Sequence, residues 1–103
     1  MLKMIKFSFH NRIDIENSTK CACFHCKKVF KPKKIIFLEE PTGGIDTGVC
    51  PKCNYDTIIT KEIVNALGFK FNRKLIQKVH DYAFKNNIEI FNIEEKKKLG
   101  KEI

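Results

Sequence analysis

Alternating hydrophobic and polar positions near the N-terminus predict a β-strand. In residues 2–9, LKMIKFSF, an extended backbone places Ile5, Phe7 and Phe9 on one face. The following segment, residues 10–20, carries two isoleucines in what we expect to be a short helical turn. These two elements lead the chain into a cluster of cysteines.

The middle of the chain predicts a β-hairpin. The run IIFLEE, residues 35–40, is rich in strand-forming residues, and the turn signal PTGG follows it at residues 41–44. The chain then leads into VCPKC, so a strand, a turn and a returning strand are the simplest prediction. We expect a third short strand in YDTII, residues 55–59.

The hydrophobic period changes from strand-like to helical in the last third of the chain. Residues 60–68, TKEIVNALG, predict a short helix that begins after a threonine cap and ends at a glycine. Residues 72–87 predict a longer helix with Asn72 as its cap, because apolar side chains recur there at helical spacing. The remaining residues begin with strand-like alternation and end in charge.

Four of the five cysteines form two Cys-x-x-Cys pairs, Cys23 with Cys26 and Cys50 with Cys53, separated by 23 residues. Each pair offers two sulfurs on one tight turn, and a hairpin between the pairs brings the turns face to face. This spacing predicts a four-thiolate zinc ribbon. Because four protein ligands close the coordination shell, the single zinc ion is expected to be structural rather than catalytic.

Two residues next to the ligands and one other metal are alternatives to this assignment. Cys21 or His25 would be a replacement ligand, although Cys21 makes an awkward pair with Cys23, and a side chain inside the first turn usually points away from the metal. Iron in a rubredoxin-like centre also takes four thiolates. The sequence lacks the aromatic and glycine pattern expected around such a redox centre, which favours zinc. Asn54 follows the second pair, where such a turn often needs a left-handed residue.

These elements predict an α+β fold: a small β-hairpin zinc ribbon with rubredoxin-like knuckles, packed with one or two C-terminal helices. The 103 residues fit one compact domain. We assign residues 1–87 to the zinc-ribbon domain with its packed helix, and residues 88–103 to a short extension.

Several segments resemble a family of short bacterial and phage proteins that are described as zinc-ribbon-like cytoplasmic proteins. The similar pieces are HN at residues 10–11, CACFHC at 21–26, TGVCPKCNYDTII at 47–59 and HDYAF at 80–84. The family more typically has glycine at the position of Asn54 and an acidic segment with tryptophan at the position of FLEE. The resemblance implies a ribbon followed by a packed helix, with zinc on the four paired cysteines, and it implies no biochemical activity.

The formal net charge of +8 suits an anionic partner such as nucleic acid. A zinc ion on four thiolates would lower this charge to about +6, and arginine, the favoured residue for phosphate and base contacts, is scarce. The basic run KKVFKPKK would follow a phosphate backbone if it lay on one strand, with Phe30 or Phe37 as a stacking surface. Its alternative role is a solubilising sheet edge. The candidate nucleic-acid-binding residues are Lys27, Lys28, Lys31, Lys33 and Lys34.

Binding modules are favoured over enzymes, because the acidic residues and His80 predict no convergent catalytic cleft. We expect a cytoplasmic, non-catalytic accessory or regulatory protein that binds nucleic acid. The alternative is a protein-interaction module or inhibitor that uses the last helix and the C-terminal extension. No run of residues is apolar enough to span a membrane. The oligomeric state is left open.

Overall fold

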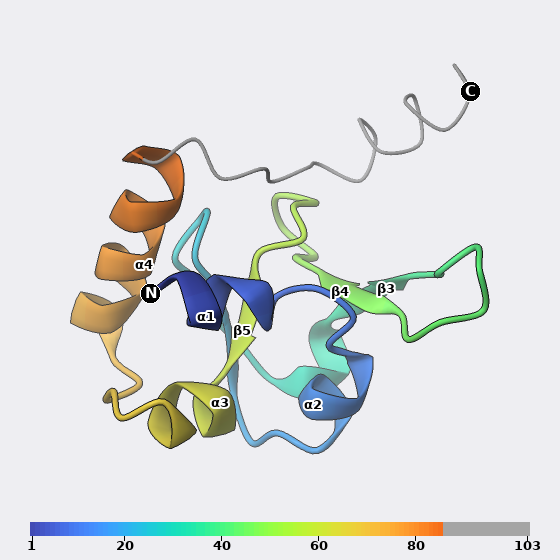
Figure 1. Cartoon of the computed structure of the whole chain (residues 1–103), viewed down its shortest axis with the longest axis horizontal. Coiled ribbons are helices and arrows are strands. Elements are labelled where there is room, and N and C mark those ends of the chain that lie inside the picture. The colour runs from blue at the N-terminus through green and yellow to red at the C-terminus, as the bar shows by residue number, and fades with distance from the viewer. Residues whose placement is uncertain (86–103) are drawn as a thin grey trace.

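The structure is a computed structural model that describes residues 1–85, and it has the predicted α+β composition (Figure 1). Short helices and strands are mixed along the chain, and one longer helix completes the described part. The elements are α1 (Leu2–Lys6), α2 (Arg12–Glu16), β1 (Cys21–Cys23), β2 (Val29–Phe30), the 3₁₀ turn η1 (Pro32–Lys34), β3 (Ile36–Leu38), β4 (Thr47–Val49), β5 (Ile58–Thr60), α3 (Lys61–Ala66) and α4 (Arg73–Lys85).

The strands form two small antiparallel sheets. β3 and β4 pair as the predicted hairpin, with Phe37 opposite Gly48. The predicted third strand is β5, but it pairs with β1 in a separate sheet of order β2-β1-β5. The sequence did not predict β1 or β2. The predicted hairpin is therefore present, while the larger sheet joins the cysteine-bearing strand β1 to β5, the segment before α3.

The three-stranded sheet is covered on both faces. In β1, Ala22 faces one hydrophobic cluster, whereas Cys21 and Cys23 face the other. In β5, Ile59 faces the cluster that contains Ala22, and Ile58 faces the cluster that contains the two cysteines. Because successive side chains of a strand point to opposite faces, full burial of both strands requires a layer of structure on each side of the sheet.

A layer of helices covers the first face of this sheet. Figure 1 shows α1, α3 and α4 on one side of β5, with α2 and the β3–β4 hairpin on the other. The cluster under the helices contains buried side chains from α1, α3 and α4 and from the strands β1 and β5. Its buried members are Met4, Ile5, Ala22, Phe24, Ile59, Val64, Leu75, Ile76, Val79 and Ala83.

The predicted N-terminal strand is wrong, because residues 2–6 form helix α1. Met4, Ile5 and Ser8 are buried, and this spacing of one and then three residues follows a helix rather than a strand. Phe7, which the alternation assigned to the buried face, is 37% exposed. Packing of Met4 and Ile5 against α4 has overridden the local alternation. The helical turn expected within residues 10–20 is confirmed as α2.

Asn11 joins the two sheets at the centre of the molecule. Its side-chain N–H donates to the carbonyl of Ile58 in β5 at 2.9 Å, and its side-chain oxygen accepts from the N–H of Gly48 in β4 at 2.8 Å. The side chain is 1% exposed. Position 48 must be glycine, since a β-carbon there would meet the side chain of Ile15. The close approach of β4 to α2 thus depends on one small residue and one bridging amide.

Both predicted C-terminal helices are present. The Thr60 side chain caps α3 by accepting from the N–H of Ile63, and the Asn72 side chain caps α4 by accepting from the N–H of Leu75 at 2.9 Å. No helix within residues 1–85 has the length and apolar character to cross a membrane. The predicted extension at 88–103 and the last residues of the predicted long helix lie outside the described residues.

Candidate metal centre

Two turns of the same geometry carry the paired cysteines, and we call them the first knuckle (residues 23–28) and the second knuckle (residues 50–55). In each knuckle the backbone N–H of the fifth residue, Lys27 or Asn54, donates to the carbonyl of the first cysteine, at 2.8 and 2.9 Å. Both residues have a φ of 64°. The left-handed conformation predicted for Asn54 is confirmed, and Lys27 adopts it at the equivalent position.

The knuckles bring together the four cysteines that the sequence predicted as ligands. Their sulfurs all lie within 4.8 Å of one another, with 3.6 Å between Cys23 and Cys53 and 3.7 Å between Cys26 and Cys50. A tetrahedron with metal–sulfur bonds of about 2.3 Å has sulfurs about 3.8 Å apart. Within residues 1–85, which include all five cysteines, none of these four is joined in a disulfide. This cluster can therefore hold one metal ion.

Hydrogen-bond donors surround the sulfurs of the two buried cysteines, Cys23 and Cys50. The N–H of Cys26 lies 3.4 Å from Cys23 Sγ, and the N–H of Cys53 lies 3.5 Å from Cys50 Sγ. The Thr57 hydroxyl, which is also buried, lies 2.9 Å from Cys23 Sγ. Such donors stabilise the charge of a thiolate and orient it toward a metal.

The clustered thiols compete for a single negative charge. A hydrogen bond with Cys23 lowers the pKa of Cys50 to about 5, and the same interaction together with burial raises the pKa of Cys23. Burial raises the pKa of Cys53 to about 11. The pKa of the Cys50 thiol is thus lowered, whereas the pKa values of the Cys23 and Cys53 thiols are raised, so Cys50 loses its proton more readily than these two neighbours. A divalent cation that displaced those protons would supply the positive charge that balances the buried thiolates.

The two alternative ligands lie outside the cluster. Cys21 is buried on the same face of β1 as Cys23, but its sulfur lies 3.2 Å from the Ser18 hydroxyl, and burial raises the pKa of its thiol. His25 stacks on the Tyr55 ring of the second knuckle, with ring centroids 4.0 Å apart. Their positions favour the prediction that Cys21 is a small buried residue and that His25 points away from the metal.

Aromatic contacts connect the knuckles to α4. The ring of Phe84 lies 5.4 Å from that of His25 and 4.6 Å from that of His80. His80 Nδ1 is 2.9 Å from the carbonyl oxygen of Phe24, at the start of the first knuckle. His80 thus forms a hydrogen bond from the helix to the first knuckle. Sequence reasoning did not find the stacking of His25 on Tyr55, because it requires the two knuckles to face each other.

The basic run does not lie on one strand. β2 contains only Val29 and Phe30, and Pro32 then begins η1, so the run bends. Its five lysines are all exposed, but the first two line one groove, and the third and fourth line another. These residues are Lys27, Lys28, Lys31, Lys33 and Lys34.

Both predicted stacking residues are partly covered. Phe30 is half-buried against the cluster that contains the cysteines. Phe37 is also half-buried there, and the guanidinium of Arg12 covers its ring at 4.5 Å from the centroid. The expectation that Phe30 or Phe37 receives an exposed base stays a prediction.

No protein family, curated protein or solved structure matches the chain. The geometry of the cysteine cluster and the distribution of charge are the observations on which a functional assignment can be based.

Proposed function

We propose that the chain is a small, non-catalytic module in which Cys23, Cys26, Cys50 and Cys53 hold one structural zinc ion in a ribbon-type site. The observation that carries this proposal is the near-tetrahedral spacing of the four sulfurs on two matching knuckles. Zinc accepts four thiolates without a geometric preference of its own. With four protein ligands the shell is closed, which supports a structural rather than a catalytic ion.

Metal titration tests the site. We expect purified protein to bind one zinc ion, and cobalt(II) to give the absorption bands of a tetrahedral four-sulfur complex. Cys50→Ser should abolish these bands, because it removes one of the two buried ligands. Cys21→Ser is the matched control, since its sulfur lies outside the cluster, and it should retain full metal binding. A cobalt spectrum without sulfur charge transfer, or equal losses in both variants, would contradict the ligand set. If the purified protein contained iron, the ligand set would stand and the assignment of zinc as the metal would be wrong.

We propose further that the module binds nucleic acid as a regulatory or accessory protein of the cytoplasm. Exposed lysines from the first knuckle to η1 support this role, because neutralising phosphate charge supplies most of the affinity of such proteins. The excess of 20 basic over 12 acidic residues in the chain acts in the same direction.

Binding to nucleic acid at two salt concentrations tests this role. The metal-loaded protein should bind a labelled oligonucleotide with an affinity that falls steeply as salt rises. Replacing all five lysines of the basic run by glutamine should weaken binding strongly while the cobalt spectrum stays unchanged. If the folded, metal-loaded protein bound neither single-stranded nor duplex nucleic acid at low salt, the proposal would pass to the alternative, a module that binds a protein partner.

A further inference from the structure

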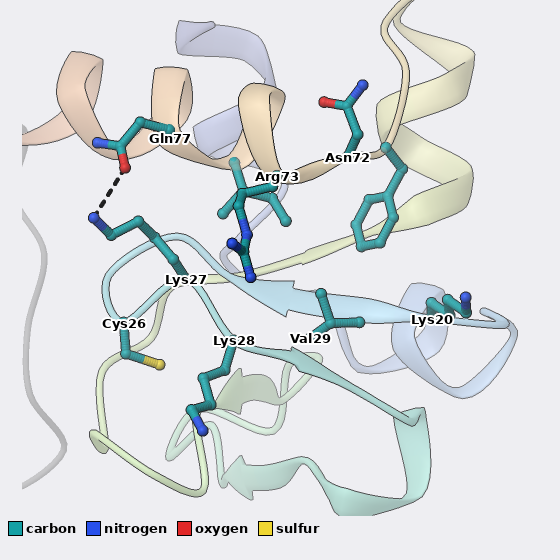
Figure 2. Close-up of a pocket in the computed structure, with 10 residues that line it drawn as sticks. Lys20, Cys26, Lys27, Lys28, Val29, Asn72, Arg73 and Gln77 are labelled. Carbon is teal, nitrogen blue, oxygen red and sulfur yellow. Dashed lines mark hydrogen bonds between the residues drawn. The ribbon is translucent and has the colours of Figure 1, made fainter.

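A basic groove lies between the three-stranded sheet and the start of α4. It has a volume of about 710 Å³ and is lined by Lys20 before β1, by the end of the first knuckle, by Val29 of β2, and by the first turns of α4 (Figure 2). Four lining residues are cationic and none is acidic. Its cationic lining residues are Lys20, Lys27, Lys28 and Arg73.

These cations are available to a ligand. Within residues 1–85 no ion pair engages any of the four, since the ion pairs found there involve His10 and Arg12. Lys27 Nζ donates to Gln77 Oε1 at 2.9 Å, which links the first knuckle to α4 at one end of the groove. Figure 2 shows Arg73 pointing from the start of α4 across the groove toward the strands. Positive charge thus lies on both walls of the groove, from the lysines on the strand side and from Arg73 on α4.

The groove also has an apolar lining. Phe71, Val29 and Ile76 contribute apolar side chains to its walls. Phe71 is half-buried and packs against the cluster under the helices, which fixes its position. It lines the same groove as the four cations. An aromatic side chain fixed in a groove with positive charges suits a ligand that alternates flat apolar rings with negative charges.

The basic surface continues on the other side of Asn72. A smaller hollow of about 180 Å³ shares this residue with the groove and again combines one aromatic side chain with cations and no acid. Its Phe69 is 39% exposed. By contrast, the groove lined by Lys31 and Lys33 contains Glu16, so its charge is mixed. The basic residues of the smaller hollow are Lys70, Lys74 and Lys78.

We infer that the groove between β1, β2 and the start of α4 binds single-stranded nucleic acid, with the phosphates on Lys20 and Arg73 and an unpaired base against Phe71. This inference rests on the proposed nucleic-acid function and names its site and ligand class. The groove is of the size that holds a ligand of one or two nucleotides. In a duplex the bases are stacked on one another, so Phe71 has no base to receive.

Two variants with the same change of charge test the position of the ligand. Lys20→Gln with Arg73→Gln alters the groove outside the basic run, while Lys3→Gln with Lys6→Gln removes the same charge from exposed positions of α1 that do not line the groove. We expect the first pair to weaken binding of a labelled oligothymidylate by about tenfold and the second by less than threefold, because local phosphate contacts outweigh distant charge. The first pair should also reduce the slope of log affinity against log salt by about 1.4.

A third variant tests the stacking. Phe71→Leu keeps an apolar side chain and all charges, and it should weaken binding by about fivefold or more at unchanged salt dependence. Each variant is compared as the metal-loaded full chain with an unchanged cobalt spectrum and unfolding midpoint; if Phe71→Leu lowers that midpoint, Phe71→Tyr, which retains the ring, should bind as the parent does.

The possible outcomes separate this inference from the proposed function. Equal losses for the two charge pairs, tighter binding of a duplex of the same length, or full binding by Phe71→Leu would overturn the groove and leave a nucleic-acid module that binds elsewhere. Absence of binding by the parent protein at low salt would overturn both.

Discussion

The left-handed position of the first knuckle is occupied by Lys27, and that of the second knuckle by Asn54. Both have a φ of 64°, a conformation that costs a residue with a β-carbon about 1 kcal/mol relative to glycine. We predict that Lys27→Gly unfolds in urea with about 1 kcal/mol more stability than Lys27→Ala, which loses the same charge but keeps the β-carbon. Equal stability of the two metal-loaded variants would show that the left-handed backbone at position 27 carries no such cost.

Replacement of Asn11 should be costly, because its buried side chain bridges the two sheets. In Asn11→Ala the buried N–H of Gly48 and the carbonyl of Ile58 both lose their partner. We expect the free energy of unfolding to fall by about 2–6 kcal/mol, at about 1–3 kcal/mol for each buried polar group. Asn17→Ala is the control: it also removes a hydrogen bond to a backbone carbonyl, but in an exposed position. Urea unfolding of the metal-loaded proteins measures both, and a comparable loss in the two would refute the bridging role.

Single residues were predictable where a local rule applied. The conformation of Asn54 follows from its place in a knuckle, but the role of Asn11 depends on partners that are 37 and 47 residues away in the chain. The same knuckle rule, applied to the position after Cys26, would have found the left-handed Lys27.

At the scale of elements, the sequence predicted those whose signals are local. Caps and helical spacing identified α3 and α4, and the turn signal identified the β3–β4 hairpin. The three residues of β1 are all buried because layers cover both faces of the sheet, so no alternation marked them as a strand. For α1 the alternation was present and misleading, since tertiary packing of Met4 and Ile5 decided the outcome.

The cap of α4 provides a test at this scale. The side-chain oxygen of Asn72 accepts the N–H of Leu75, one of the donors that a helix start leaves without an intrahelical partner. Asn72→Ala should lower the free energy of unfolding by about 1 kcal/mol, and Asn72→Asp should retain it. Thermal unfolding followed by circular dichroism measures the difference. Asn65→Ala, at an exposed position in α3, is the control and should change stability by less than half of that amount.

At the scale of the whole molecule, the metal centre could be predicted and the groove could not. Each knuckle is a local turn, so the spacing of the cysteines was sufficient to predict which four sulfurs would meet. The groove exists only because α4 lies beside β1 and β2, and because Lys20 and Arg73, which are 53 residues apart in number, line the same space. A sequence pattern contains no signal for such a juxtaposition.

The two hydrophobic clusters share β1 and β5, so loss of the metal should affect the entire described domain. The cluster with the cysteines consists of few apolar side chains, and without metal it would hold buried thiols that repel a second negative charge. Structural zinc contributes on the order of 10 kcal/mol, which is comparable to the total stability of a domain. We therefore predict that a strong chelator unfolds the protein in one transition, with the helical circular dichroism of α4 lost together with the cobalt-binding site.

The control for this prediction is the Cys21→Ser variant, which keeps the four ligands and should unfold at a similar chelator concentration after allowance for any lower stability of the metal-loaded form. Readdition of zinc should restore the helical signal and the metal site in parallel. If the chelated protein kept its helical signal and a cooperative thermal transition, the cluster under the helices would be stable by itself, and the metal would organise only the knuckles and the hairpin. The first outcome makes any binding in the groove depend on metal, because Lys27 and Lys28 belong to the first knuckle, while the second predicts that Arg73 and Phe71 keep their places on a stable helical layer.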